Sequence, residues 1–288
     1  MSGEVVVVTG ASSGIGRETA LGYAGRGASV ILAARSEDAL HDVAQECWSA
    51  GADDVLVYVA DIAEADQVQA LFATAADRFG RVDIAVQCAA ITAFGRFEDI
   101  PVEVFDGIVR TNLIGSANVA RAALVHFQKH ESGHLVLIGS LLGTAAAPYQ
   151  SAYVATKFAL QGLVRVLRQE NQHLPGIKVH GVYPGPVDTP VYGSASNYFG
   201  RTPRVPPTAV SPATVVSAII RATNRRRSTE RQVGWFNRPA IAAYTLLPTV
   251  YDALIGPFLR RVAFTSEPSE PSDGNVFDRS PGGRASAE

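Results

Sequence analysis

The chain has 288 residues, of which 47% are hydrophobic and 18% are charged, so it is long and apolar enough to bury a sizeable core and is not a disordered protein. Its 25 basic and 27 acidic residues leave a formal net charge of −2, which excludes the strong positive field that gathers nucleic acid or anionic lipid. The two cysteines, Cys47 and Cys88, form neither a CxxC motif nor a dense framework, so the sequence favours a reducing cytoplasm over a disulfide scaffold or a cysteine metal site.

Short runs of β-branched residues alternate with longer amphipathic stretches, as in βαβ units around a parallel sheet that is covered on both faces. The expected strands are Val5–Thr9, Ser29–Ala33, Asp54–Val59, Asp83–Gln87, Gly133–Gly139, Lys178–Tyr183 and Gln232–Trp235. The expected helices are Ile15–Gly25, Glu37–Ala50, Glu64–Phe79, Val102–His130, Tyr149–Asn171 and Ala213–Asn224. The sequence therefore predicts an α/β fold with one seven-stranded, mostly parallel sheet.

Three later segments break this alternation. Residues 190–212 are rich in Gly, Ser, Pro and aromatic residues, and they are long enough for a loop that closes over a binding site. Residues 238–264 are strongly apolar, whereas residues 265–288 are rich in Ser, Pro, Gly and Glu and are predicted to be disordered. We therefore expect one domain over residues 1–237 that includes the loop, an apolar helical extension of it, and a disordered tail.

The apolar extension has hydrophobic residues at spacings of three to four, so one helical face is expected to cover a pocket, a second subunit or a membrane surface. Asp252, Pro248 and Pro257 interrupt the run and argue against a membrane span. Arg238 and the Arg260–Arg261 pair would suit anionic headgroups, but the absence of lysine and the prolines favour packing on a pocket or a subunit over membrane contact.

A glycine-rich segment, Thr9-Gly10-Ala11-Ser12-Ser13-Gly14-Ile15-Gly16, follows the first strand directly. Gly10 permits a sharp exit from the strand, Gly14 lets the backbone approach a pyrophosphate, and Gly16 lets the next helix pack closely on the sheet. The N-terminus of that helix offers free N–H groups and positive potential. A plain flexible turn is the alternative, but the position in the first βαβ unit favours a dinucleotide-binding loop.

The end of the second strand distinguishes between the two nicotinamide cofactors, because NAD-binding sites place an acidic residue there. This chain has Arg35 and Ser36 instead, which suit a 2′-phosphate. A solvated Arg35 is the alternative, and the neighbouring Glu37 and Asp38 add some repulsion, but the sequence favours NADP(H) over NAD(H). Asp61, after the third strand, either accepts a hydrogen bond from the adenine amino group or caps the following helix.

Tyr153 and Lys157 lie four residues apart on an expected helix, so both side chains project from one face. A phenol is a poor base at neutral pH, and a neighbouring ammonium together with a positive nicotinamide ring would lower its pKa. Ser140, at the end of the fifth strand, can donate a hydrogen bond to a substrate oxygen, and Asn112 can hold a water that links Lys157 to solvent. A Tyr-x-x-x-Lys pair is common on helix surfaces, so its significance depends on the glycine-rich segment upstream.

Together these motifs resemble the signature of the short-chain dehydrogenase/reductase family from about Val5 to Thr189. The matching positions are Thr-Gly-x-x-x-Gly-x-Gly at 9–16, Asn112, Ser140, Tyr-x-x-x-Lys at 153–157 and Pro-Gly-x-Val-x-Thr at 184–189. The resemblance implies a single Rossmann-type, doubly wound domain with helices on both faces. It also implies that Tyr153 is the general acid/base, that Ser140 orients the carbonyl or alcohol, that Lys157 binds the nicotinamide ribose and that Asn112 supports the proton relay.

The resemblance further implies that Val187 and Thr189 contact the nicotinamide carboxamide. The full set of expected cofactor-binding residues is Gly10, Ser12, Ser13, Gly14, Ile15, Gly16, Arg35, Ser36, Asp61, Ile62, Ala89, Tyr153, Lys157, Pro184, Gly185, Val187 and Thr189. One segment departs from the family, since Gln87-Cys88-Ala89-Ala90 stands where Asn-Asn-Ala-Gly is common. This change affects the hydrogen bonding near the adenosine and leaves the catalytic residues intact.

The implied activity is hydride transfer between NADP(H) and the alcohol or ketone carbon of a small molecule. The expected pocket residues are Leu141, Leu142, Tyr192, Tyr198 and Phe199, a mostly apolar set that favours a bulky apolar substrate. Reduction of 3-oxoacyl thioesters is an alternative, with Arg201 or Arg204 receiving an anionic carrier. A catalytically idle NADP-binding sensor or scaffold is another, which the intact catalytic residues disfavour.

The resemblance also implies a homodimer or homotetramer, in which the helices expected at Val102–His130 and Tyr149–Asn171 pair across a two-fold axis. No metal is expected, because no carboxylate or cysteine completes the spacing of His126, His130 and His134. No nucleic-acid partner is expected either, because Arg225–Arg227 is typical of a solvated turn in a chain of this charge.

Overall fold

A seven-stranded parallel sheet forms the centre of the protein in a computed structural model that describes residues 3–277. Its strand order is β10-β7-β6-β4-β1-β2-β3. The strands are β1 (Val5–Thr9), β2 (Ser29–Ala34), β3 (Asp54–Val59), β4 (Ile84–Gln87), β6 (Gly133–Ile138), β7 (Ile177–Pro184) and β10 (Glu230–Val233). The predicted Rossmann-type fold is confirmed, and the strand order reverses between β1 and β4, which is where such sheets bind ligands.

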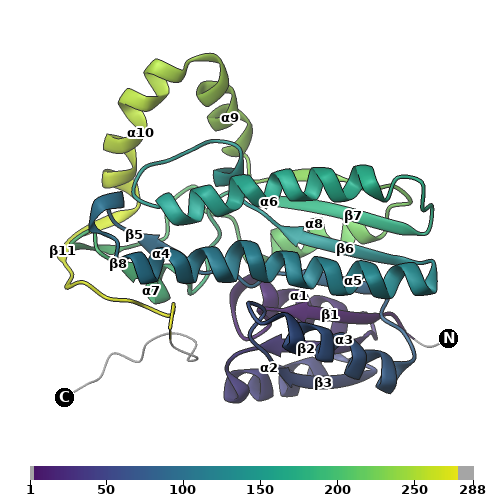
Figure 1. The fold of residues 1–288 in the computed structure, drawn as a ribbon. Helices are drawn as coiled ribbons and strands as arrows, with labels where there is room; N and C mark the ends of the chain where they lie inside the picture. The colour runs from purple at the N-terminus through teal and green to yellow at the C-terminus, as the bar shows by residue number, and fades with distance from the viewer. Residues whose placement is uncertain (1–2, 278–288) are drawn as a thin grey trace.

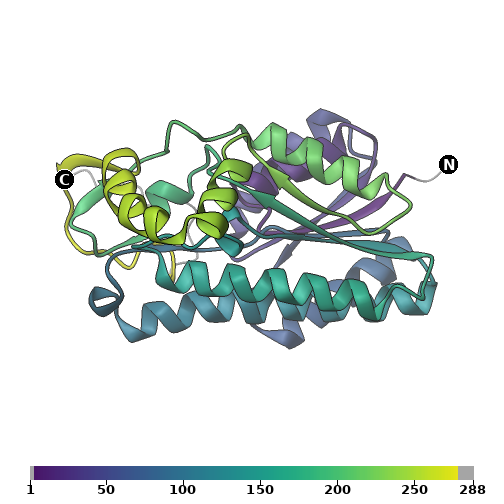
Figure 2. The same cartoon turned by 90° about the horizontal axis from the view of Figure 1, so that it is seen from above.

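Helices cover both faces of this sheet (Figures 1 and 2). One face carries α1 (Gly14–Ala24), α2 (Glu37–Ala50) and α8 (Pro212–Thr223), and the other carries α3 (Ala65–Phe79), α5 (Ser116–His130) and α6 (Ser151–Glu170). In β1, Val6 and Val8 pack under the first set of helices while Val5 and Val7 pack under the second. This double burial explains why the strands are continuous apolar runs instead of alternating patterns.

The helix predicted over residues 102–130 is interrupted. It consists of α4 (Val102–Val109), a π-helical turn (Arg110–Gly115) and α5. Inside the π-helical turn the buried side chain of Asn112 pairs with the backbone of Ile91, and such turns are frequent at functional sites. The turn lies beside the carboxyl end of the sheet, where the candidate site is found.

Small elements gather at the carboxyl end of the sheet, at the left of Figure 1. The loop predicted over residues 190–212 contains α7 (Val191–Ser194), β8 (Ser196–Asn197) and β9 (Arg201–Pro203). Strand β8 pairs with β5 (Ala93–Phe94), and β9 pairs with β11 (Phe264–Pro268). Two 3₁₀ turns, Phe97–Asp99 and Leu141–Gly143, complete this region.

The tail predicted to be disordered is ordered as far as residue 277. Its first part lies in β11, and Val276 is buried in a cluster with residues of β5 and α4. Composition did not reveal this, because the order comes from contacts with distant segments. The rest of that predicted segment, residues 278–288, lies outside the described residues.

The apolar extension forms two helices, α9 (Asn237–Leu246) and α10 (Pro248–Val262), which stand as a hairpin above the carboxyl end of the sheet in Figure 1. The break falls at Leu247, directly before Pro248, which has no N–H group to continue α9. Within residues 3–277, no helix combines the length and the apolar character that a membrane crossing requires.

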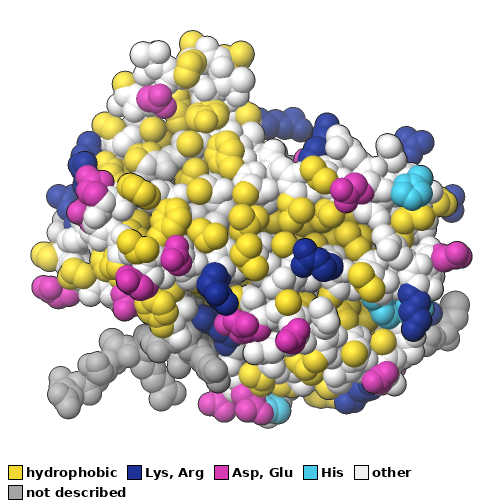
Figure 3. Space-filling model, in the orientation of Figure 1, with side chains coloured by type: hydrophobic (Ala, Val, Ile, Leu, Met, Phe, Trp, Pro, Cys, Tyr) yellow, Lys and Arg dark blue, Asp and Glu magenta, His cyan; other side chains and the backbone are white. Residues whose placement is uncertain are grey.

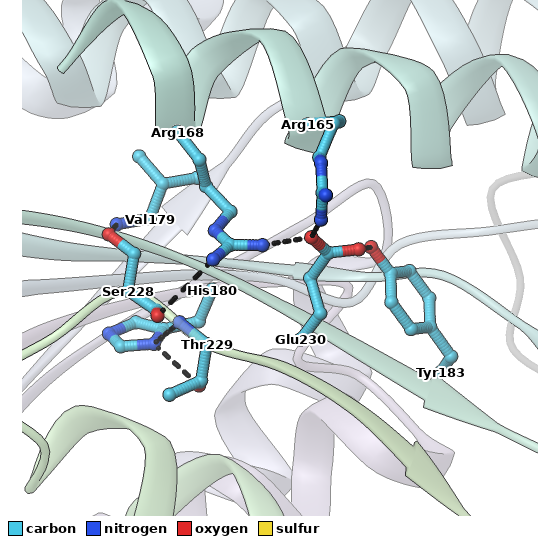
Figure 4. A network of polar contacts seen from close by, with 8 residues as sticks. All are labelled: Arg165, Arg168, Val179, His180, Tyr183, Ser228, Thr229 and Glu230. Carbon is cyan, nitrogen blue, oxygen red and sulfur yellow. Dashed lines mark hydrogen bonds and ion pairs between the residues drawn. The ribbon is translucent and has the colours of Figure 1, made fainter. Parts of the chain in front are cut away.

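A polar network ties the edge strand β10 to the rest of the domain (Figure 4). Glu230 accepts hydrogen bonds from Arg165 at 2.8 Å, from Arg168 and from the Tyr183 hydroxyl at 3.1 Å. Burial raises the pKa of the Glu230 carboxyl, but the hydrogen bonds from Arg165 and Tyr183 and the charges of both arginines outweigh it and lower this pKa overall. The carboxylate therefore stays charged and joins β10 to β7 and α6.

A second part of the same network surrounds His180, which is fully buried in β7 (Figure 4). The backbone N–H of Thr229 donates to Nδ1 of His180 at 3.2 Å, so the ring proton resides on Nε2 and is donated to Nδ1 of His134 at 3.1 Å. Burial, together with the charges nearby, lowers the pKa of His180 to about 3. The imidazole is thus neutral at all but strongly acidic pH.

Candidate active site

A cavity of about 730 Å³ runs along the carboxyl ends of the central strands. Its lining includes the glycine-rich loop after β1, the ends of β2, β4, β6 and β7, and the N-terminal part of α6. A cavity at this place is where doubly wound sheets hold a dinucleotide, and its size is that of a ligand pocket. We call it the groove.

The glycine-rich loop has the geometry that a phosphate site needs. Gly10 has φ +70°, and a Cβ there would lie 2.6 Å from the backbone of Ala89. A Cβ on Gly16 would lie 2.0 Å from the carbonyl oxygen of Gly10, so the loop and α1 pack too closely for any side chain. Within the described residues no side chain caps the start of α1 at Ser13, so its backbone donors face the groove.

Arg35 and Ser36 line the groove at the end of β2, as the sequence predicted. The Arg35 guanidinium donates through Nη2 to the carbonyl oxygen of Asn275 at 2.7 Å and through Nη1 to that of Val276 at 3.1 Å. Ser36 occupies the N-cap position of α2. A cation beside backbone N–H groups is the combination that binds a phosphate, so these residues fit a 2′-phosphorylated cofactor.

Asp61 and Ile62 line the groove beyond β3. Asp61 Oδ1 accepts from the backbone N–H of Ala63 at 2.9 Å, which is the capping role that the sequence left open, although α3 itself starts two residues later. The same carboxylate faces the groove, so capping and contact with a ligand are compatible.

The segment that departs from the family pattern is held by its own amide. Gln87 Nε2 donates to the carbonyl oxygen of Ala89 at 3.0 Å and to the Ser116 hydroxyl at 2.8 Å. The glutamine therefore fixes the loop beside Gly10 from within the core. The sequence predicted altered hydrogen bonding here, but it did not reveal that the Gln87 side chain would bind Ala89 and Ser116.

Tyr153, Lys157 and Ser140 converge on the groove from the start of α6 and the end of β6. Lys157 is buried, and its Nζ donates to the carbonyl oxygen of Ile138 at 2.9 Å and lies 5.3 Å from the centre of the Tyr153 ring. The backbone N–H of Leu142 donates to the Ser140 hydroxyl at 3.1 Å. The hydroxyl accepts in this bond, so its proton can be donated to the Tyr153 phenol or to a ligand in the groove.

Burial dominates the protonation of this pair. It raises the pKa of Tyr153 to about 12, with the hydrogen bond of Ser140 opposing the rise, and it lowers the pKa of Lys157 to about 8, with nearby Cys88 opposing the fall. The sequence argument led us to expect a lowered phenol pKa from the ammonium and a positive nicotinamide ring together. In the protein without a cofactor, burial dominates and keeps the pKa of the phenol high. An added positive charge in the groove would lower it.

Asn112 is fully buried behind this pair. Its Oδ1 accepts from the backbone N–H of Ile91 at 2.9 Å, and its Nδ2 donates to the Ile91 carbonyl at 2.8 Å and to the Thr156 hydroxyl at 3.3 Å. The amide is thus engaged in fixing the loop after β4 to the π-helical turn and α6. The Asn112 backbone carbonyl also accepts a hydrogen bond, from the Ser116 hydroxyl at 2.6 Å. The water relay predicted for Asn112 stays a prediction.

The segment after β7 lines the groove with Pro184, Gly185, Val187 and Thr189. A Cβ on Gly14 would lie 3.3 Å from the side chain of Thr189, so this segment reaches across to the glycine-rich loop. The residues expected to hold the nicotinamide and those expected to hold the pyrophosphate therefore face one another.

Three of the five predicted pocket residues, Leu141, Leu142 and Tyr192, line the groove. Burial raises the pKa of Tyr192, and the Tyr153 phenol adds to the rise. Tyr198 and Phe199 are not among the described lining residues. Tyr198 donates to the Asp273 carboxylate, in the segment after β11. Phe199 stacks on Phe264 of β11 with ring centres 3.9 Å apart.

Helices α9 and α10 form much of the apolar wall of the groove, and none of their residues is among the five predicted pocket residues. The groove-lining residues from this region are Phe236, Pro239, Ala240, Ala243, Leu247, Val250, Tyr251, Leu254, Ile255, Phe258, Leu259 and Val262. Of the three roles left open for this segment, the structure shows the covering of a pocket. The spacing of three to four was the available signal, but only the tertiary contacts show which surface it meets.

Similarity to known proteins extends over most of this chain. Residues 4–197 match the family model described as short chain dehydrogenase. The uncharacterized oxidoreductase YxnA of Bacillus subtilis (strain 168) is 32% identical over 272 residues, which are 94% of this chain and 76% of that protein. The 11-beta-hydroxysteroid dehydrogenase A of Arachis hypogaea is 38% identical over 192 residues, 66% of this chain and 54% of that protein.

Among solved structures, an alcohol dehydrogenase from the archaeon Thermococcus sibiricus, complexed with 5-hydroxy-NADP, is similar with a TM-score of 0.70 and 29% sequence identity. The alignment covers 81% of this chain and 97% of that one. The structural similarity therefore covers most of the domain and is not confined to the part that contains the glycine-rich loop.

Proposed function

Because this chain belongs to the short chain dehydrogenase family of oxidoreductases, we propose that it transfers a hydride between NADP(H) and the alcohol or ketone carbon of a bulky apolar molecule. The observation that carries the proposal is the meeting of Ser140, Tyr153 and Lys157 in one groove with the glycine-rich loop. A phosphate-binding loop and an acid/base pair in one cavity serve both a cofactor and a reacting oxygen.

The choice of NADP(H) is supported by Arg35 at the end of β2, where an acidic residue would favour NAD(H). It is also supported by the 5-hydroxy-NADP bound to the similar archaeal alcohol dehydrogenase. The uncapped start of α1 and the close-packed Gly10 and Gly16 would hold the pyrophosphate, while Val187 and Thr189 would meet the carboxamide.

When bound, the nicotinamide ring supplies or accepts the hydride, and its oxidised form brings a positive charge to this part of the groove. Tyr153 donates its phenol proton to the substrate oxygen during reduction and removes it during oxidation. Ser140 donates a hydrogen bond to that same oxygen and fixes its position. Lys157, while protonated, favours the phenolate that Tyr153 becomes.

A bulky apolar substrate is supported by the lining of the groove. Of the described lining residues, Asp61 alone is acidic, and it lies at the far, adenosine end. Near Tyr153 the wall is formed by Leu141, Leu142 and the apolar faces of α9 and α10. The relative from Arachis hypogaea is named for a hydroxysteroid, a substrate of this kind.

Exposed apolar side chains at the mouth of the groove also support a bulky apolar substrate. Leu247, Val250 and Leu254 line it and are also 56%, 53% and 62% exposed. Hydrophobic side chains gather on the visible surface of α9 and α10 in Figure 3. An apolar molecule therefore meets apolar surface before it enters the groove.

Reduction of 3-oxoacyl thioesters is less well supported. Arg204, a candidate partner for an anionic carrier, donates to the carbonyl oxygens of Arg261 at 2.6 Å and Val262 at 3.1 Å. Neither Arg201 nor Arg204 belongs to the described lining of the groove. The arginine thus fastens the loop to α10, and its charge does not face the reacting centre.

The experiment that tests the proposal measures NADPH oxidation by the purified protein against ketones of increasing apolar size, polar sugars and short 3-oxoacyl thioesters. We expect kcat/KM to rise from short ketones to medium-chain and polycyclic ketones. A preference for sugars would contradict the apolar substrate, and a preference for thioesters would favour the alternative reaction. Absence of turnover with every carbonyl, combined with tight NADPH binding, would favour a cofactor sensor.

A further inference from the structure

The segment Ser272–Phe277, which we call the strap, is fastened to the loop that follows β7. The backbones of Ser272 and Asn197 exchange hydrogen bonds of 3.0 and 2.7 Å, and the N–H of Asn275 donates to the carbonyl oxygen of Ser194 at 2.9 Å. Ser196 Oγ donates to the Asp273 carbonyl at 2.6 Å. In Figure 1 the yellow chain can be followed from β11 past α7 along this path.

Two residues of the strap require a close fit. Gly274 has φ +54°, and a Cβ there would lie 2.5 Å from backbone atoms of Ala195 and Ser196. Val276 is buried in a cluster that includes Ile91 and Ile108. The first residue lets the strap lie flat on the loop, and the second anchors it beside α4.

From these attachments the strap reaches the opposite side of the groove. Its carbonyl oxygens at Asn275 and Val276 accept from Arg35, which follows β2, and Asn275 also lines the groove. In the sheet, β6, β4 and β1 separate β7 from β2. The strap therefore joins two elements between which the whole phosphate-binding part of the groove lies.

The contact with Arg35 orients a cation without neutralising it. A carbonyl oxygen accepts a hydrogen bond but has no formal charge, whereas a carboxylate would compete with a phosphate for the guanidinium. Nη1 and Nη2 each carry two hydrogens, so donors remain for a further ligand. Arg35 is thus held in place with its charge available.

We propose that the strap closes the groove over the bound dinucleotide and retains it, by bridging the substrate loop to Arg35 and by fixing this guanidinium toward the 2′-phosphate. The proposal extends the NADP(H) site proposed above and rests on it for the role of the phosphate. Cofactor entry and release then require the strap to detach from the loop at Gly274 and from its apolar anchor at Val276.

The test is the rate of cofactor release after rapid mixing, followed by the fluorescence of the reduced nicotinamide. Gly274→Ala forces a Cβ into the loop backbone, and Gly80→Ala is the matched control, because Gly80 has φ +77° with open space around it at the end of α3. We expect Gly274→Ala to speed NADPH release by at least about tenfold, as lost hydrogen bonds to a charged group would, while the control stays within about twofold.

A pair of truncations provides a second variant that does not depend on how the alanine is accommodated. Ending the chain after Pro271 removes the strap, whereas ending it after Phe277 retains it. Only the first should speed release. Amide hydrogen exchange at Asn275 in the full chain should slow when NADPH is added, which reports closure without any turnover.

Release rates that stay at the wild-type value in both Gly274→Ala and the chain ending at Pro271 would overturn the proposal. If release of NADH is accelerated as much as that of NADPH, the role assigned to Arg35 orientation is wrong. A wild-type preference for NADH would instead refute the cofactor choice of the proposed function, and NADH release would then test closure by itself.

Discussion

The ammonium nitrogen of Lys157 lies 5.3 Å from the centre of the Tyr153 ring, and both groups are buried in the same groove. Burial works against the charged form of each, since it raises the pKa of the phenol to about 12 and lowers that of the ammonium to about 8. Near neutral pH the phenol is therefore protonated, and an additional positive charge in the groove would favour its ionisation.

Tyr153→Phe is expected to lower kcat by about 100- to 10,000-fold, because the phenol transfers the proton. The affinity for NADPH should change by no more than a few-fold, measured by fluorescence titration. Tyr58→Phe, which removes a hydroxyl from β3 outside the groove lining, is the control and should keep normal turnover. Near-normal turnover in the Tyr153 variant would show that another group supplies the proton.

Lys157→Met should abolish turnover and change the pH dependence of stability. Because the pKa of Lys157 falls from 10.5 in the unfolded chain to about 8 in the fold, its buried charge costs stability fully below pH 8, and the cost disappears above pH 10.5. The unfolding free energy of wild type should therefore rise relative to the variant by about 3 kcal/mol across this interval. Denaturant titrations at several pH values measure it, and a constant difference would contradict the burial of a charged lysine.

His180 should contribute to unfolding in acid. Its pKa falls from 6.5 to about 3 in the fold, so the stability it provides is complete above pH 6.5 and is lost as the pH falls toward 3, with a slope of up to about 1.4 kcal/mol per pH unit. His180→Gln should lower stability at pH 7 and flatten this slope. His41→Gln, at an exposed position on α2, should leave the slope unchanged. An equal acid slope in wild type and the His180 variant would refute the assignment.

Arg35→Asp should reverse the cofactor preference, because it removes a phosphate contact and adds a like charge. The specificity for NADP over NAD should fall by about 10- to 1,000-fold. Titration of both cofactors with wild type, Arg35→Asp and the exposed-site control Arg26→Asp decides the matter. A wild type that binds NAD more tightly would contradict the prediction.

A dimer through α5 and α6 is expected. Val125 on α5 and Val166 on α6 are 63% and 46% exposed, and hydrophobic side chains are prominent over these helices in Figure 3. Val125→Arg should weaken association, whereas Trp48→Arg, on α2, should not. Light scattering that gives a molar mass near 30.4 kDa for wild type at micromolar concentration would contradict the expectation.

The sheet and the proximity of Tyr153 to Lys157 were predictable from sequence because their signals are local. Strands buried on both faces are continuous apolar runs, and the loop at Gly10–Gly16 must follow a strand and open a helix. The i, i+4 spacing of Tyr153 and Lys157 places both on one helical face whatever the rest of the chain does.

The parts that sequence did not reveal depend on distant contacts. The segment that ends at residue 277 is held by Arg35, which lies 240 positions before Asn275 in the sequence. Tyr198 and Phe199 do not belong to the described lining of the groove, because Tyr198 bonds to the strap and Phe199 packs on β11. The π-helical turn at Arg110–Gly115 was also missed, because the sequence predicted one continuous helix over residues 102–130. The pKa of Tyr153 depends on how deeply the fold buries it.

Helix α6 carries Tyr153 and Lys157 near its start. Arg165 and Arg168, which bind Glu230 of the edge strand, lie about 12 to 23 Å further along the same helix. A rigid helix transmits a shift at one end to the other. The ion pairs of Glu230 therefore fix the far end of the same helix that presents the Tyr153 phenol to the groove.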